Sequence, residues 1–462
     1  MVQKQHSAGD PTAEPKKRRR VGFFKADAGI EANQCIKIYM VSSKEQVGAL
    51  DGFCIDPVDL NDFFEEDGKI YGYDGLKITI WISSVSFNAY ADVTYKSTCD
   101  GGKGITDLKS SLQRIFADTL VESKDAFLQS FSSENHLIRS IISTGEILQL
   151  NASDGQIGDS NSRLVEEVSD LKVVRMVIGK TDAGHVYSHL IPLVLLLIDG
   201  SNPIDVTDPG WELFVLIQEK NGEPGDIQHR LLGFTAVYRF YHYPDKTRLR
   251  LSQILILPPY QHKGYGRHLV EAVNNVAISE DVYDLTVEEP LSNFQHVRTC
   301  VDIKRLLEFD PIQDAISSAV SSLKKGKLEK KIHVPRLLPP STAVDVVRKI
   351  LKINRTQFLQ CWEVLVYLGL SSEDKCMEDY VTIISNRVKA DILGKDSECG
   401  RKQMIEVPSK YDPEMSFVIF RSGIEGSIQV DENQINQKEQ LQELIDERLS
   451  EIKLIAQKLR PA

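Results

Sequence analysis

A strand that stops at two prolines and leads into a glycine turn and a helix constrains this chain most. Alternating polar and apolar residues predict a strand over Leu249–Leu257, which Pro258 and Pro259 end because proline cannot donate to a sheet ladder. Gly264 and Gly266 then allow a tight turn with close approach of the backbone. The apolar residues that follow share one helical face, namely Leu269, Val270, Val273, Val276 and Ala277. The outward N–H groups of such a helix start predict an anion site.

The letters of this turn exclude two common nucleotide-binding loops. A dinucleotide-binding fingerprint requires a third glycine, but Leu269 occupies that position, and a Walker loop requires Gly-Lys-Ser/Thr, which the turn lacks. What remains is Gln261-x-x-Gly264-x-Gly266 after a strand. This spacing suits a ligand that carries a pyrophosphate, and a purely structural turn is the alternative interpretation.

The segments around the turn predict a mixed α/β unit. Alternation gives further strand candidates at Leu193–Ile198, Trp211–Gln218, Leu231–Tyr241 and Tyr283–Val287. Two more strands are expected nearer the N-terminus, at Cys35–Val41 and Leu76–Ile82. Helices are expected up to Leu307 after the last strand, and over Ala343–Leu368 and Asn433–Leu459. The last of these helices is expected to pack on a helical domain, with a coiled coil for a partner as the alternative.

The expected fold class is therefore α/β of the α+β kind. A mixed sheet with flanking helices is expected in the centre, with an N-terminal α/β domain before it and a C-terminal helical domain after it. The expected divisions are a disordered leader (1–30), an N-terminal substrate-binding domain (31–165), a catalytic domain (166–325) and a helical domain (326–462).

Two adjacent carboxylates follow the strand that comes after the glycine turn. Glu288 and Glu289 precede Pro290, at the carboxyl edge of the sheet where open α/β sheets bind ligands. A free lysine amine has a pKa of about 10.4 and needs a base before it can act as a nucleophile at neutral pH. A carboxylate whose pKa is raised by burial and by a like-charged neighbour suits that task. The alternative is a solvated acid pair at a strand end.

Charge is distributed unevenly along the 462 residues. The chain carries a net charge of −11, yet residues 1–25 hold seven basic residues and two acidic ones. Five consecutive cations at Lys16–Arg20 resemble a monopartite nuclear import signal, so we expect the protein in both the nucleus and the cytoplasm. The acidic remainder argues against direct nucleic-acid binding and favours a cationic partner. The acidic cluster at 56–67 is a candidate receiver for a Lys- or Arg-rich peptide, with a solvated helix face as the alternative interpretation.

Membrane and metal functions are not expected. The longest apolar stretch, Leu190–Ile198, is nine residues long and contains Pro192, whereas a membrane-spanning helix needs about 20. The seven cysteines include no CxxC pair and no Cys/His spacing suited to zinc. We therefore expect no membrane segment and no metal site.

Taken together, these motifs resemble the catalytic subunits of type B histone acetyltransferases, within the GNAT acetyltransferase superfamily. The resemblance rests on Tyr243–Arg248, on Ser252–Gly266 and on Glu288–Pro290. Residues from Gly72 to Ile78 resemble the N-terminal domain of that family. It implies transfer of acetyl from acetyl-CoA to tail lysines of newly synthesised free histones, chiefly the fourth core histone, in a ternary complex. A histone-binding WD-repeat propeller is the implied partner.

The resemblance also implies roles for individual residues. Glu288 would be the general base and Glu289 its acidic neighbour, at a position where the family often has Asp. The implied acetyl-CoA contacts are Ile254, Leu255, Ile256, Gln261, His262, Lys263, Gly264, Tyr265, Gly266 and Arg267. The implied histone-tail contacts are Asp67, Gly68, Lys69, Trp211, Tyr238, Arg239 and Phe240.

Three other readings stay open at the level of sequence. A non-catalytic histone chaperone could bind tails with its acidic N-terminal part and merely retain coenzyme A. A GNAT enzyme for a small amine is less favoured, because a small substrate needs no extended groove. Cys300 could carry an acyl group, but a buried structural thiol is the favoured interpretation. Apart from His296, one helical turn away, no residue near it in sequence could activate the thiol.

Overall fold

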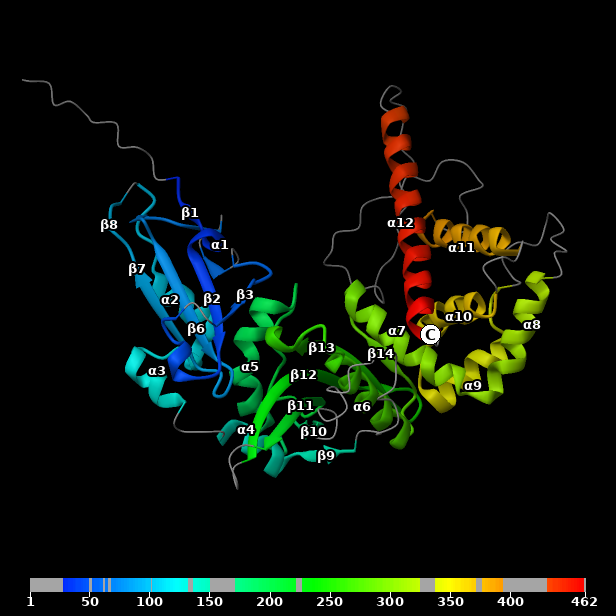
Figure 1. The fold of residues 1–462 in the computed structure, drawn as a ribbon, viewed down its shortest axis with the longest axis horizontal. Helices are drawn as coiled ribbons and strands as arrows, with labels where there is room; N and C mark the ends of the chain where they lie inside the picture. The colour runs from blue at the N-terminus through cyan, green and yellow to red at the C-terminus, as the bar shows by residue number, and fades with distance from the viewer. Residues whose placement is uncertain are drawn as a thin grey trace, which may run out of the picture.

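The computed structural model describes residues 28–49, 52–60, 63–64, 68–100, 102–131, 136–149, 171–221, 227–324, 337–370, 376–393 and 430–460. Figure 1 shows an N-terminal α/β part in blue and cyan, a central sheet in green, and a helical part in yellow and red. No described helix is long and apolar enough to cross a membrane. Residues 1–27 of the expected leader, including Lys16–Arg20, and Asp67 lie outside the described residues, whereas Ile30 belongs to strand β1 (Ile30–Glu31).

A four-stranded sheet forms the N-terminal part, in the order β3-β2-β6-β7. These strands are Phe53–Ile55, Ile36–Val41, Lys77–Ser83 and Ala89–Thr94. The two strands expected from the sequence are confirmed as β2 and β6, which run parallel to each other. Gly72 lies at the edge of this part with a φ of +84°, and a Cβ there would lie 2.7 Å from the Ile105 side chain, so the site requires glycine. The smaller elements are β1 (Ile30–Glu31), α1 (Ala32–Cys35), β4 (Lys69–Ile70), β5 (Tyr73–Asp74), β8 (Ser97–Thr98), α2 (Leu108–Phe116), α3 (Lys124–Ser130) and α4 (His136–Thr144).

The central sheet has six strands in the order β14-β13-β12-β11-β10-β9. Neighbouring strands are antiparallel except β13 and β14, which are parallel. The strands are Glu146–Leu148, Leu171–Val177, Trp211–Asn221, Ile227–His242, Lys246–Ile256 and Leu285–Val287, from β9 to β14. Helix α5 (Ala183–Leu197) covers one face and α6 (Tyr265–Ser279) the other. The strands predicted around the glycine turn are confirmed, and so is the helix after it.

One expected strand is wrong. Leu193–Ile198 was read as a strand, but Leu193 to Leu197 form the last turns of α5, which also contains Pro192. This helix packs between α2 of the N-terminal part and strand β11, so apolar side chains are buried on most of its circumference. A helix buried all round shows no helical period, and a short apolar run cannot then be distinguished from a buried strand.

The C-terminal part is helical, and its core also includes α7, which directly follows the central sheet. Its helices are α7 (Ser292–Leu307), α8 (Gln313–Lys324), α9 (Ser341–Leu351), α10 (Arg355–Leu368), α11 (Cys376–Leu393) and α12 (Val430–Leu459). The expected long C-terminal helix is confirmed as α12, which buries Ile445, Ile452 and Ile455 against this core. The single helix expected over Ala343–Leu368 is instead two helices with a corner at Lys352–Asn354.

Hydrophobic cores cross two of the three expected domain boundaries, those at residues 165 and 325. One core joins residues of the N-terminal sheet and α2 to α5 and to strands β10–β12, on both sides of residue 165. A second core joins α7 and α8 to the helices after residue 326. A third core lies between α6 and the opposite face of the central sheet.

Candidate functional site

A β-bulge in strand β13 creates the site. Val237 of β12 pairs with Leu251 and Ala236 pairs with Gln253, so Ser252 is an extra residue without a direct partner on β12. Side chains alternate between the two faces of a strand, and one inserted residue therefore reverses the alternation beyond it. Leu251 accordingly belongs to the core beneath α6.

Beyond the bulge, β13 has an open edge. Strand β14 pairs with β13 over Leu249–Leu251, and the last contact is the amide of Glu288, which donates to the Leu251 carbonyl at 3.0 Å. The amide of Leu257 donates to Leu232 of β12, so by alternation the peptide groups of Ile256 face away from β12. The described part of the chain places no strand there. Strand β14 thus ends opposite Leu251, and from Ser252 onward main-chain groups of β13 line an opening on this side of the strand.

The glycine turn closes one end of this opening. The side-chain amide of Gln261 donates to the Ile256 carbonyl at 2.9 Å and ties the turn to the open edge. Gly264 precedes helix α6 with a φ of +82°, and a Cβ there would have no neighbour within 4 Å. The first turn of α6 faces this open space with the exposed side chain of Lys263 beside it. Positive helix-dipole charge, peptide N–H groups and cationic side chains make the turn suited to a phosphate-bearing ligand.

The structure therefore brings together the ten residues expected to contact acetyl-CoA. Ile254–Ile256 lie on the open edge of β13, and Gln261–Arg267 form the turn and the start of α6.

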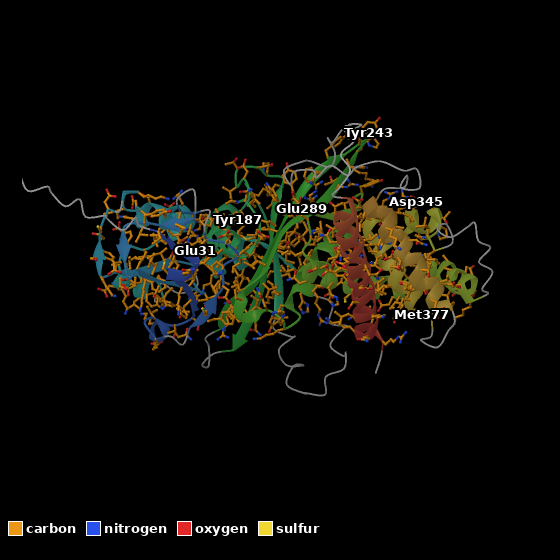
Figure 2. The ribbon with its side chains drawn as sticks, turned by 90° about the horizontal axis from the view of Figure 1, so that it is seen from above. Glu31, Tyr187, Tyr243, Glu289, Asp345 and Met377 are labelled. Carbon is orange, nitrogen blue, oxygen red and sulfur yellow. The ribbon has the colours of Figure 1, made fainter. Side chains whose placement is uncertain are left out.

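The carboxylate pair lies where β14 ends, beside the bulge. The Ser252 hydroxyl donates to a Glu288 carboxylate oxygen at 2.6 Å. Glu289 follows with a φ of +32°, and Figure 2 shows it near the middle of the molecule, between the N-terminal and the helical parts. Both carboxylate side chains are exposed. The prediction that this pair is buried is therefore wrong. The hydrogen bond from Ser252, which positions Glu288, could not be seen in the sequence.

Three of the expected tail-binding residues form an aromatic row. Trp211 and Tyr238 are cross-strand partners with ring centroids 4.9 Å apart, and Tyr238 lies 4.6 Å from Phe240. The Arg250 guanidinium stacks over Phe240 at 4.5 Å. The Tyr238 hydroxyl donates to Asp208 at 2.9 Å, which fixes the ring. Gly68 and Lys69 belong to the N-terminal part, where Lys69 pairs with β1.

Arg239 does not join this row. Its guanidinium pairs with Glu212 and Glu280, and the Arg175 guanidinium donates to both oxygens of Glu212 at 2.9 Å. Glu212 is buried, and its two oxygens are held by these two cations. Burial by itself lowers the pKa of Arg175, but the carboxylates of Glu212 and Glu280 outweigh it and raise that pKa. The side chain of Arg239 thus serves a structural ion cluster.

A buried polar network, also missed from sequence, fixes the segment after α5. The Gln253 amide donates to Ser201 Oγ at 2.9 Å and to the Asn202 carbonyl at 2.7 Å. The Tyr187 hydroxyl donates to Gln253 at 2.8 Å and accepts from the Ile204 amide at 3.1 Å. Gln253 is the residue directly after the bulge, so this network holds residues 201–204 against the part of β13 beyond the bulge. A lone glutamine among apolar strand residues was the available signal.

Cys300 is a buried thiol. Burial is the largest influence on its pKa and raises it, and its sulfur lies 3.7 Å from His296 Nε2. A raised thiol pKa suppresses the nucleophilic thiolate, so Cys300 has the properties of a structural residue.

His268, in the first turns of α6, gives the fold a dependence on pH. Burial, helped by the nearby Arg267, lowers its pKa from 6.5 to about 4. The unfolded chain binds a proton below pH 6.5 that the folded chain refuses until about pH 4, so stability is lost as the pH falls through this window. Relative to His268→Gln, the wild type is expected to lose about 2 kcal/mol between pH 7 and pH 5 in urea unfolding. Equal losses in the two proteins would contradict a neutral buried imidazole.

Comparison with known proteins agrees with this geometry. A family model described as the N-terminus of histone acetyl transferase HAT1 matches residues 28–199, and the acetyltransferase (GNAT) family model matches residues 203–297. The type B histone acetyltransferase catalytic subunit of Arabidopsis thaliana is 58% identical over 99% of this chain and 98% of its own length. That of Zea mays is 44% identical over 99% of this chain and 96% of its own length. With this identity over nearly the whole length, the chain belongs to the family of type B histone acetyltransferase catalytic subunits.

Proposed function

We propose that this acetyltransferase transfers acetyl from acetyl-CoA to lysines in the tails of newly synthesised free histones, chiefly the fourth core histone. The observation that carries the proposal is the end of β14 opposite Leu251, which leaves the open edge of β13, the glycine turn and Glu288 around one opening. Membership of a family of catalytic subunits favours this enzyme over the non-catalytic chaperone.

The opening fits acetyl-CoA. The pantetheine arm carries amides that can pair with the main-chain groups of Ile254 and Ile256, much as an added strand does, while Leu255 between them directs its peptide groups to β12. The pyrophosphate fits the start of α6, where Gly264 leaves open space and Lys263 adds positive charge. Bound there, acetyl-CoA supplies an activated acetyl carbonyl beside the end of β14.

Glu288 is the proposed base. A lysine amine that enters from the aromatic row gives up a proton to the carboxylate, which Ser252 Oγ holds through its 2.6 Å hydrogen bond. The neutral amine then attacks the thioester carbonyl directly in the ternary complex, the C–S bond breaks as the amide bond forms, and coenzyme A leaves as its thiol, so the chain needs no acyl-carrying residue. Both carboxylates are exposed, so bound substrates have to exclude water from them. Glu289 adds negative charge that attracts the lysine ammonium.

The proposed tail site follows the aromatic row. Rings of Trp211, Tyr238 and Phe240 offer apolar area and cation–π contacts to a lysine-rich peptide. The part of the acidic cluster that the structure describes, Asp56 and Asp59, is exposed on the N-terminal part. Gly68, Lys69 and Asp67 remain proposed contacts, although Asp67 lies outside the described residues. Direct nucleic-acid and membrane binding are not part of the proposal.

A WD-repeat histone-binding propeller is the proposed partner, and both nucleus and cytoplasm are the proposed locations. The location rests on the basic run Lys16–Arg20, and the partner rests on the family resemblance.

Competition between substrates tests the proposal. Transfer of labelled acetyl is measured to a tagged peptide of the fourth core histone's tail, which is captured by its tag. The reaction contains as competitor either the same tail peptide without a tag or a polyamine. We expect the tail peptide to suppress labelling at concentrations near its KM, and the polyamine to have little effect at the same concentration. Preferred acetylation of the polyamine would instead identify a small-amine acetyltransferase.

A further inference from the structure

Strand β14, which carries the carboxylate pair, is three residues long and has β13 as its partner on one side. So short a strand is poorly fixed by a single neighbour. Its outer side is covered by the corner between α9 and α10. The Leu285 amide donates to the Lys352 carbonyl at 2.8 Å, and Leu285 forms a parallel bridge with Ile353. Ile353 of the helical part thus pairs with the outer edge of β14 as a neighbouring strand would.

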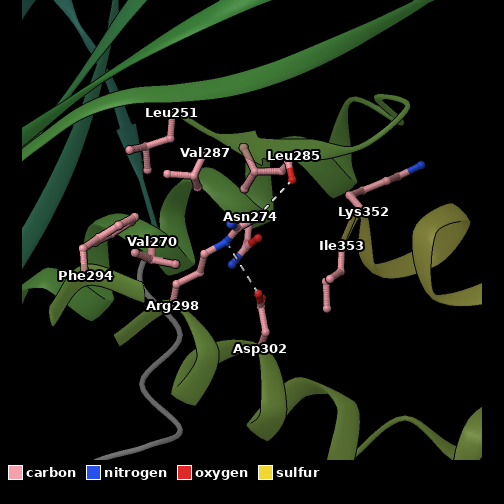
Figure 3. Close-up of a pocket in the computed structure, with 10 residues that line it drawn as sticks. All are labelled: Leu251, Val270, Asn274, Leu285, Val287, Phe294, Arg298, Asp302, Lys352 and Ile353. Carbon is pink, nitrogen blue, oxygen red and sulfur yellow. Dashed lines mark hydrogen bonds and ion pairs between the residues drawn. The ribbon is translucent and has the colours of Figure 1, made fainter. Parts of the chain in front are cut away.

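Two side chains complete this attachment at the Leu285 carbonyl. The Asn354 amide donates to it at 2.9 Å. The Arg298 guanidinium donates to it at 3.4 Å (Figure 3). Arg298 is itself buried and lies 3.9 Å from the Asp302 carboxylate. Both hydrogen-bonding groups of the Leu285 peptide are therefore occupied from the helical part, three residues before Glu288.

The corner itself is held firmly. Lys352 has a φ of +60°, and its buried side chain pairs with Asp281, which precedes β14. Asn354 is the N-cap of α10, since its side-chain oxygen accepts from the Gln357 amide at 3.0 Å. The same side chain thus caps a helix with its oxygen and holds β14 with its nitrogen.

We propose that the corner Lys352–Asn354 positions Glu288 for proton transfer, which makes the helical part a component of the acetylation site rather than an appendage. The proposal rests on the base role proposed for Glu288. Asn354 is a positioning residue that acts through β14, because it lies on the outer side of the strand while the acetyl-CoA opening lies on the inner side, between β14 and β13.

Asn354→Asp separates the two tasks of this side chain. Aspartate keeps the oxygen that caps α10 but cannot donate to the Leu285 carbonyl. We expect kcat to fall by about tenfold or more, because small displacements of a reacting group are costly, while the Kd for coenzyme A stays within about twofold of the wild type. Asn354→Ser also keeps a capping oxygen, introduces no charge, and is expected to lower kcat in the same sense.

Glu363→Gln is the matched structural control. Glu363 is a buried partner of Arg448 and Arg387 in the same helical part, away from β14. It is expected to lower the Tm without lowering kcat at a temperature where the protein stays folded. A parallel loss of kcat in Glu363→Gln would reduce Asn354 to a stability role and overturn the proposal.

Glu288→Gln distinguishes the positioning role of Asn354 from the base role proposed for Glu288. If Asn354 acts through Glu288, then Asn354→Asp causes no further loss in a Glu288→Gln background. An additive loss there overturns the positioning role. Wild-type kcat in both Asn354 variants, together with an inactive Glu288→Gln, overturns this inference alone. Wild-type turnover in Glu288→Gln contradicts the proposed base and with it this inference.

Discussion

Glu288→Gln is expected to lower kcat for a histone-tail peptide by about 100- to 10,000-fold, the usual contribution of a positioned general base. Glutamine keeps the shape of the side chain and still accepts a hydrogen bond from Ser252, so the end of β14 should keep its structure. What is lost is an acceptor for the lysine proton. The measurement is steady-state acetyl transfer at saturating acetyl-CoA, with the Kd of coenzyme A measured alongside by calorimetry.

Glu289→Gln is the matched control for that result. It removes the same charge from the neighbouring residue, which no hydrogen bond ties to Ser252 in the described structure. We expect a smaller fall in kcat, chiefly through weaker attraction of the lysine ammonium. Equal losses in the two variants would mean that the summed negative charge matters rather than a base at position 288. A Glu288→Gln enzyme with normal kcat would remove this residue from proton transfer.

Gly264→Glu is expected to weaken binding of acetyl-CoA by about 100-fold or more. Two negative charges about 4 Å apart near a protein surface repel by about 4 kcal/mol, and the new carboxylate would lie where the pyrophosphate is proposed to bind. A side chain at a φ of +82° adds backbone strain of about 1–2 kcal/mol. Isothermal titration with coenzyme A measures the effect directly.

Gly104→Glu separates charge from strain. Gly104 has a φ of +84°, and a Cβ there would also have no neighbour within 4 Å, but it lies in the N-terminal part. It is expected to show the same strain and a normal affinity for coenzyme A. Gly264→Ala, which adds strain without charge, should weaken binding by less than about tenfold. Normal affinity in Gly264→Glu would place the pyrophosphate elsewhere.

The sequence was most informative where the local pattern and the fold agree. The strand, glycine turn and helix at Leu249–Ser279 were predictable because prolines, glycines and an apolar stripe each mark a boundary. Helix α5 was not, because burial on most sides erases its period. The corner at Lys352 was also missed, since neither glycine nor proline marks it and an ion pair between the buried Lys352 and the exposed Asp281 supports its backbone.

The side chains of the site show the same division. Tyr238 and Phe240 lie two residues apart on strand β12, so their side chains share one face of the sheet. The same alternation places the side chain of Arg239 on the opposite face. The sequence alone therefore predicts that the side chain of Arg239 does not join Tyr238 and Phe240 in contacting a histone tail. No such argument was available for the bulge at Ser252, because an inserted residue is defined by its partner strand.

The core shared by α2, α5 and the central strands also bears on how the protein is made. The N-terminal sheet leaves the ribosome first, but the apolar face of α2 has no cover until α5 has been synthesised. Domains normally fold in turn as they emerge, with exposed apolar surface as the hazard of delay. Here the shared core can close only after residues 117–197 have also left the ribosome, so the first part of the chain completes its folding together with the second.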